Sequence, residues 1–297
     1  MLRNCSPYTF IILSFLALIM VGTLLLSLPF AHVSGGGFTY FEALFTATSA
    51  VTVTGLTVCD VHSTFSIYGE VIVLLLIQLG GLGILTLSSV IILLITKKIS
   101  FYTKRLVSEG LNHEAKIDLY SHIKKVVFVV LLIEAIGAAL LFFVFVGKYP
   151  WYKALYYGIF HSVSAFCNAG ISLFRDSLEG YTMHWGMNII ISLLVIFGGL
   201  GFTAIIELYE YLIGKRRKIS VNSKFSTLIT LLLLGVGTFL FFILEYRYTG
   251  ELTDGSVQQR LLVSFFHSAS LRTAGFSTVS LAGISGATAL LCMLRMF

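Results

Sequence analysis

The chain has 297 residues, of which 57% are hydrophobic and only 11% charged, and its formal net charge is +6. This composition excludes a soluble globular protein, because several uninterrupted apolar runs reach the ~20 residues needed to cross a bilayer. The four cysteines lie far apart without a CxxC pair, so neither a zinc site nor a disulfide framework is expected. The sequence therefore predicts an all-α, multi-pass protein of the cell membrane.

Five full membrane spans are expected in chain order. They cover about residues 8–30, 69–96, 125–147, 186–213 and 224–247. After the first, third and fifth spans comes a short apolar segment, then a glycine turn rich in Ser, Thr and Asn. Such a segment, for example 40–50, covers only ~15 Å as a helix, half of the ~30 Å hydrocarbon core. We expect it to enter the membrane and return on the same side.

An internal repeat links these segments. "FTATSAVTVTGLTV" (45–58) matches "FHSVSAFCNAGISL" (160–173) at an offset of 115, and "FHSASLRTAGFSTV" (266–279) is a third copy, one residue shorter. The spans that follow also match, in "QLGGLGIL" (78–85) and "IFGGLGFT" (196–203). The predicted repeats are 1–98, 125–214 and 224–297, joined by cytoplasmic loops 99–124 and 215–223. The third copy is expected to be incomplete, because its glycine pair would lie beyond Phe297.

The positive charge predicts the orientation. The loop 97–125 carries seven Lys and Arg residues and the loop 214–224 carries five, together twelve of the twenty in the chain. The positive-inside rule places both loops in the cytoplasm, so the glycine turns enter from outside. The basic loops serve orientation alone, or they also dock a cytosolic partner or anionic lipid.

The glycine turns predict an ion pathway. Non-helical backbone at membrane depth is tolerated where it is buried in protein or lines a watery cavity. Backbone carbonyls there can replace the hydration shell of a cation, and glycine permits the dihedrals and the close approach that this requires. The alternative, that small residues only let helices pack closely, is disfavoured because the pattern recurs three times. The expected ion ligands are the backbone oxygens of Val53, Thr54, Gly55, Asn168, Ala169, Gly170, Thr273, Ala274 and Gly275.

Other polar residues lie at membrane depth. Arg272, beside the third turn, is expected either to pair with an outer acid or loop carbonyls, or to affect ion occupancy directly. Glu134 and Glu207 are expected to face protein or water, in structural hydrogen bonds or in a conducting role. Arg272 and Glu134 are therefore candidate supports of the ion site. His161 and His267 are expected to be packing residues, and the GGLG runs to serve close helix packing rather than hinges.

The three glycine turns resemble the first three filter loops of the Trk/Ktr/HKT superfamily of potassium and sodium transporters. The segments that carry the resemblance are "SAVTVTGLTV", "SAFCNAGISL" and "SLRTAGFSTV". The resemblance covers essentially the whole chain and is greatest to the Ktr-type potassium uptake membrane subunit. It implies four helix, pore half-helix, filter loop, helix repeats around one potassium-channel-like pore, of which about 2.7 are present here.

The resemblance also implies a homodimer in membrane lipid, seated on a cytosolic ring of nucleotide-binding regulatory subunits. Gly55 is similar to the potassium-conducting members, because sodium-selective relatives often have serine there. Potassium is therefore the expected permeating ion, with sodium as the alternative. The family's fourth filter loop and the gating loop of its third repeat are not among the 297 residues, so these residues alone are not expected to conduct selectively.

Two other functions stay open. One is a sodium- or proton-coupled cation symporter, whose signature would be inverted repeats, whereas the copies here are two spans apart and hence parallel. The other is a non-conducting part of a split assembly. There is no P-loop, GxSxG or HExxH motif, so no enzyme, organic cofactor or nucleic-acid partner is expected.

Overall fold

The computed structural model describes residues 7–33, 39–83, 119–215, 217–246, 256–280 and 284–296. Within these ranges the regular elements are helices, and an isolated bridge joins His32 to Phe65. Among the described residues, two helices are long and apolar enough to cross a membrane alone, within Lys124–Phe145 and Val221–Leu244. The expected all-α, multi-pass membrane fold is therefore confirmed.

The first unit consists of α1 (Pro7–Leu26), α2 (Tyr40–Thr52), the short α3 (Val61–Thr64) and α4 (Ile67–Gly81). A single 3-10 turn follows α1 at Pro29–Ala31. The 13 residues of α2 span about 20 Å, less than the hydrocarbon core. It packs against both α1 and α4. The predicted second span, 69–96, begins as α4, but its part after residue 83 lies outside the described residues.

A capping box fixes where α2 begins. The Thr39 hydroxyl accepts from the Glu42 amide, and the Glu42 carboxylate accepts from the Thr39 amide at 2.7 Å. This backbone hydrogen bond lowers the pKa of the exposed Glu42 carboxyl. The outer end of the short helix is thus set by local sequence.

The second unit follows the same plan, with a longer first helix and a longer half-helix. Its helices are α7 (Leu119–Phe145), α8 (Trp151–Phe166), α9 (Trp185–Gly199) and α10 (Phe202–Leu212), with a 3-10 turn at Glu179–Tyr181. The short α8 packs against α7 and α9, as α2 does against α1 and α4.

The third unit consists of α11 (Val221–Tyr246), α12 (Val257–Thr273) and α13 (Gly286–Met296). A second capping box, between Ser256 and Gln259, starts α12. The helix α12 packs against both α11 and α13. We call α2, α8 and α12 the half-helices.

The segment predicted as a span, 186–213, is not one straight helix; its two helices together are long and apolar enough to cross a membrane. The chain bends by 108° between α9 and α10. Gly201 has φ +87° and ψ 144°, a conformation that interrupts a helix and that glycine adopts without strain. After the bend, α10 packs on α7, where Lys125 Nζ lies 2.6 Å from Glu210 Oε1. The second GGLG run therefore breaks the helix, which differs from the expectation of packing alone.

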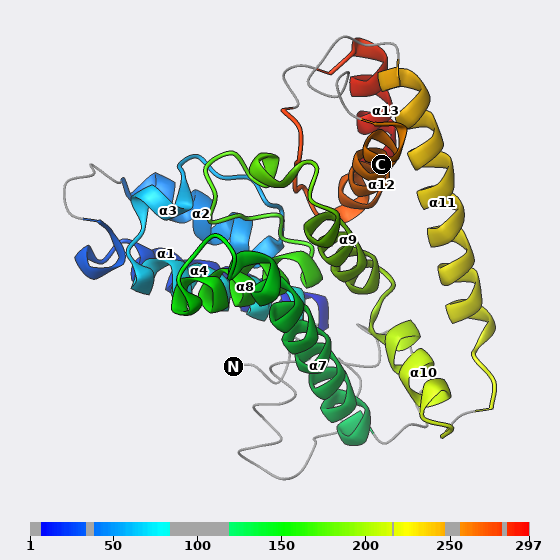
Figure 1. Ribbon diagram of the computed structural model, residues 1–297. Coiled ribbons are helices and arrows are strands. Elements are labelled where there is room, and N and C mark those ends of the chain that lie inside the picture. Colours follow the sequence, from blue (N-terminus) through cyan, green and yellow to red (C-terminus); the bar gives the residue numbers. More distant parts are fainter. Residues whose placement is uncertain are drawn as a thin grey trace.

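Units one and three lie on opposite sides of unit two (Figure 1). The last long helix of one unit packs against the half-helix of the next: α4 against α8, and α9 against α12. One apolar core runs through the first two units and includes Ala274 and Phe276 of the third. This packing brings the ends of the three half-helices together.

Candidate functional site: the glycine loops

The three half-helices end in the same kind of turn. In each, an amide donates to the carbonyl of a serine five residues earlier: Thr54 to Ser49 at 2.9 Å, Ala169 to Ser164 at 2.8 Å, and Gly275 to Ser270 at 3.2 Å. The glycine of each turn then takes a positive φ, which is +81° at Gly55, +68° at Gly170 and +81° at Gly275. Residues with a Cβ are strained there, which explains glycine at all three places. We call these turns the first, second and third glycine loops.

The one-residue difference between the copies has a local explanation. Val53 and Asn168 leave their helices in the left-handed region, with φ +56° and +60°. In the shorter third copy α12 continues through Thr273, and Ala274 stays right-handed with φ −106°. The third copy therefore reaches Gly275 without an additional left-handed residue before it.

The glycine loops are in direct contact. A Cβ on Gly55 would lie 2.4 Å from the Ala169 carbonyl oxygen and 3.6 Å from that of Ala274. A Cβ on Gly170 would lie 1.9 Å from the Ala274 oxygen. Backbone oxygens of the second and third loops therefore face neighbouring glycines, with no room for a methyl group between them.

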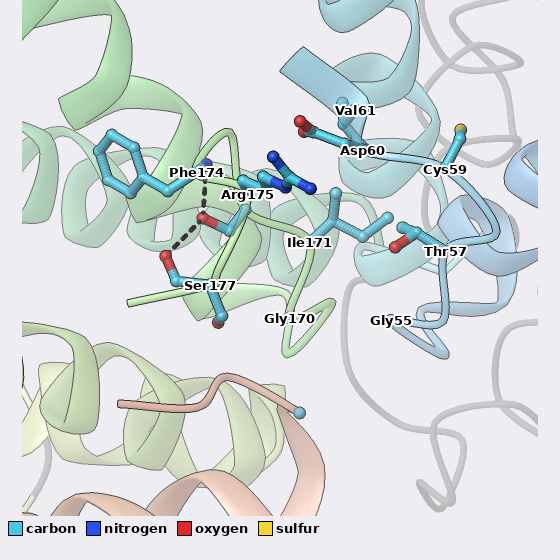
Figure 2. Close-up of a pocket in the computed structure, with 12 residues that line it drawn as sticks. Gly55, Thr57, Cys59, Asp60, Val61, Gly170, Ile171, Phe174, Arg175 and Ser177 are labelled. Carbon is cyan, nitrogen blue, oxygen red and sulfur yellow. Dashed lines mark hydrogen bonds between the residues drawn. The ribbon is translucent and has the colours of Figure 1, made fainter. Parts of the chain in front are cut away.

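A pocket of about 160 Å³ opens beside all three glycines (Figure 2). Among its lining residues, two carry formal charges, Asp60 and Arg175. Each lies five residues after its loop glycine, at equivalent places in the first two copies. The sequence analysis proposed neither residue as part of the site; their equal spacing from the two glycines was the available signal.

Behind the loops, polar contacts hold the break between α9 and α10. With the side-chain amide of Asn168 turned so that its nitrogen faces acceptors, this nitrogen donates to the Val195 carbonyl at 3.1 Å and to Thr273 Oγ1 at 3.0 Å. Its oxygen lies 3.2 Å from the Gly199 amide nitrogen. Arg272 donates to the Gly199 carbonyl at 3.1 Å. The second and third loops thus contact both the N–H and the C=O of Gly199, and Arg272 binds a carbonyl at the helix break rather than an outer acid.

Glu134 lies buried between the first two units. Its two carboxylate oxygens accept from Gln78 Nε2 at 3.0 and 3.1 Å, and Cys167 Sγ lies 3.9 Å from one of them. The Ser162 hydroxyl of α8 donates to the Glu134 carbonyl at 2.7 Å. Glu134 therefore joins α7 and α4 directly behind the second loop, and a conducting role for it stays a prediction. Glu207 likewise accepts from the Ser220 amide at 2.9 Å.

The two repeated histidines, His161 and His267, contact the chain that returns after the second and the third glycine loop. His161 Nε2 lies 3.1 Å from Ser172 Oγ, and His267 Nε2 lies 3.3 Å from Thr278 Oγ1. Their rings stack on Phe174 and Phe241, at 4.8 and 5.0 Å between centroids. These contacts agree with the packing role expected from the sequence.

A buried carboxylate that sequence reasoning did not single out joins the first two units. Glu70 is only 2% exposed. It accepts from the Tyr156 hydroxyl of α8 at 2.5 Å and lies 2.7 Å from His62 Nδ1. No sequence pattern relates Glu70 to Tyr156, because they are 86 positions apart.

Fold and site together define a multi-pass helical membrane protein with half-helices that end in converging glycine loops. A family model described as TrkH, cation transport protein, matches residues 2–297, and the chain belongs to this family. The family comprises transporters rather than enzymes, and the predicted resemblance to the Trk/Ktr superfamily is confirmed.

Individual relatives agree with this assignment. The chain is 40% identical over 274 residues to a Ktr system potassium uptake protein B of Vibrio alginolyticus, covering 91% of this chain and 59% of that protein. It is 36% identical over 298 residues to the potassium/sodium uptake protein NtpJ of Enterococcus hirae, covering 99% and 65%. A Bacillus subtilis Ktr system potassium uptake protein B is 34% identical over 293 residues, covering 98% and 65%.

The fold is similar to the crystal structure of the potassium transporter TrkH from Vibrio parahaemolyticus. The TM-score is 0.71 at 19% sequence identity, and the match covers 99% of this chain and 57% of that one. The chain thus spans 57–65% of the length of these four proteins.

Proposed function

We propose that this chain forms a large part of a selective pore for potassium uptake across the cell membrane. The observation that carries the proposal is the convergence of three left-handed glycines, two of them against the carbonyl oxygens of neighbouring loops. The names of the relatives, potassium uptake and potassium/sodium uptake proteins, support a monovalent cation as the substrate.

Backbone oxygens of the nine predicted loop residues replace the hydration shell of the ion in this mechanism. The half-helices contribute as well, because the carbonyl ends of α2, α8 and α12 lead into the loops and carry partial negative charge. Serine hydroxyls hold the returning chain: Ser164 donates to the Ile171 carbonyl at 2.7 Å, and Ser270 to that of Phe276 at 2.6 Å. Rigid loops of this kind keep the oxygens at a spacing that suits one ion size.

Potassium is proposed over sodium because of Gly55. By resemblance, glycine at this place is similar to the potassium-conducting members of the superfamily, whereas sodium-selective relatives often have serine there. A side chain at this place would also meet the Ala169 carbonyl oxygen. The name of the Enterococcus relative makes sodium the second candidate ion. Selectivity measured on the wild-type protein distinguishes the two.

The assembly is proposed by resemblance to Ktr-type subunits. The chain functions as repeats 1–98, 125–214 and 224–297 within a homodimer embedded in lipid. The cytosolic nucleotide-binding subunits dock near the basic loops 99–124 and 215–223. The positive charge of these loops suits an acidic protein surface or anionic lipid headgroups.

The test is growth and ⁸⁶Rb⁺ uptake in a bacterium that lacks its own potassium uptake systems, with the protein expressed from its complete reading frame. Saturable uptake that K⁺ inhibits and Na⁺ leaves largely unchanged supports the proposal. Uptake that requires Na⁺ or H⁺ at a fixed stoichiometry would establish a symporter instead. Absence of uptake in a protein that reaches the membrane would refute both.

A further inference from the structure

Asp60 and Arg175 are the formally charged residues that line the pocket beside the three glycines. In Figure 2 the Asp60 carboxylate and the Arg175 guanidinium lie on the same side of the pocket, away from Gly55 and Gly170. The remaining lining residues are neutral, so the formal charges at the wall of the pocket are one negative and one positive group.

The two charges differ in how they are held. Asp60 Oδ1 accepts from the His62 amide at 3.1 Å, which caps α3 and fixes the carboxylate. Arg175 is exposed, and it forms no ion pair or hydrogen bond with any residue in the described part of the chain. The Arg175 charge is therefore not neutralised by a salt bridge to Asp60, and both charges act on what enters the pocket.

A cation that approaches the glycines through this pocket passes both groups. Opposite charges raise the local concentration of an ion and like charges lower it, and a concave site strengthens the effect. A fixed carboxylate favours the cation, whereas an unpaired guanidinium competes with it for the same space. A guanidinium at the mouth of a cation site thus lowers the affinity of the site for the cation.

We propose that Asp60 and Arg175 form an opposed charge pair that sets the cation affinity of the outer mouth, Asp60 raising it and Arg175 lowering it. The inference rests on the proposed function, because it concerns ions that enter the same site. It assigns affinity-determining roles to two residues outside the glycine loops. It also explains why equivalent places in the first two copies carry opposite charges.

The experiment compares Arg175→Gln, Asp60→Asn and the double variant by the KM for ⁸⁶Rb⁺ uptake in cells that express the complete reading frame. Removing the Arg175 charge should lower KM about two- to fivefold, and removing the Asp60 charge should raise it by a similar factor. The double variant should return close to the wild-type KM. Asn keeps the capping oxygen that α3 uses, so Asp60→Asn is expected to fold.

Two controls separate charge from shape. Arg175→Lys keeps the charge and should leave KM unchanged, and Asp176→Asn changes a neighbouring exposed charge that does not line the pocket. The shifts should shrink when N-methylglucamine chloride is raised from 10 mM to 300 mM, because the Debye length falls from ~30 Å at 0.01 M to below ~8 Å. A purely structural effect would not depend on ionic strength.

Unchanged KM values in both single variants, or shifts in the same direction, would overturn the charge pair while leaving potassium uptake in place. Absence of cation uptake by the wild-type protein would refute the proposed function and this inference together.

Discussion

Replacing Gly170 by alanine adds a single methyl group at the contact between the second and third glycine loops. The new Cβ would lie 1.9 Å from the Ala274 carbonyl oxygen, whereas real contacts of this kind are essentially never below 3.0 Å. One of the two loops must therefore move by about 1 Å, and errors of about 1 Å in a critical geometry cost ~10²-fold in activity. Gly170 also has φ +68°, which costs a residue with a Cβ roughly 1–2 kcal/mol.

The matched control is Gly214→Ala. Gly214 has φ +73° but nothing within 4 Å of its Cβ position, so it carries the backbone strain without the collision. Both variants should lose roughly 1–2 kcal/mol of stability, measured by thermal unfolding in detergent. Only Gly170→Ala should reduce ⁸⁶Rb⁺ uptake, or its preference for K⁺ over Na⁺, by at least about tenfold. Wild-type uptake and selectivity in Gly170→Ala would refute the close contact between the loops.

Three further substitutions test the surroundings of the loops. Gly198→Ala would place a Cβ 1.8 Å from the Phe166 carbonyl oxygen at the end of α8. It should therefore separate α8 from α9 and lower the melting temperature more than Gly214→Ala does. Equal melting temperatures of the two variants would contradict this packing. Glu134→Gln retains one acceptor for Gln78, so we expect a loss of about 1 kcal/mol with unchanged uptake, and a large loss of uptake in well-expressed protein would instead establish a conducting role. Tyr156→Phe leaves the buried Glu70 with one hydrogen-bond partner fewer, which should cost about 1–3 kcal/mol in thermal unfolding; an unchanged melting temperature would show that this bond does not stabilise the contact between units one and two.

The glycine loops were predictable because they depend on residues that are close together in the sequence. Three segments share the same glycine, hydroxyl and aromatic residues, and a half-helix of that length cannot cross a bilayer. The roles of the loop backbone oxygens stay predictions, whereas the positive φ at Gly55, Gly170 and Gly275 is a feature of the structure.

The bend after α9 was not predictable in the same way. No charged residue occurs between 186 and 206, on either side of the break, and hydropathy carries no information about the direction of a helix. Tertiary partners also contact the break, since Arg272 binds the Gly199 carbonyl from 73 positions away. A glycine run is compatible with both packing and bending, and in this chain Gly198 serves the first and Gly201 the second.

Contacts between units were also beyond sequence reasoning. Glu70 with Tyr156, and Glu134 with Gln78, are pairs separated by 86 and 56 positions. Charged residues at membrane depth predict that partners exist, but not which ones. Arg175 was missed because a lone arginine after a loop is usually a solvated surface residue.

The most direct test of the pore is flux through purified protein, expressed from its complete reading frame and reconstituted in liposomes. Vesicles loaded with K⁺ are diluted into N-methylglucamine chloride that contains tracer ⁸⁶Rb⁺, so that the outward K⁺ gradient drives the tracer inward through any K⁺-selective pathway. The account predicts tracer accumulation that external K⁺ inhibits and that Na⁺ barely affects. In Gly170→Ala the accumulation should fall at least about tenfold, or Na⁺ should inhibit it as K⁺ does. Accumulation that persists unchanged in Gly170→Ala, or that occurs only with an imposed Na⁺ or H⁺ gradient, would contradict it.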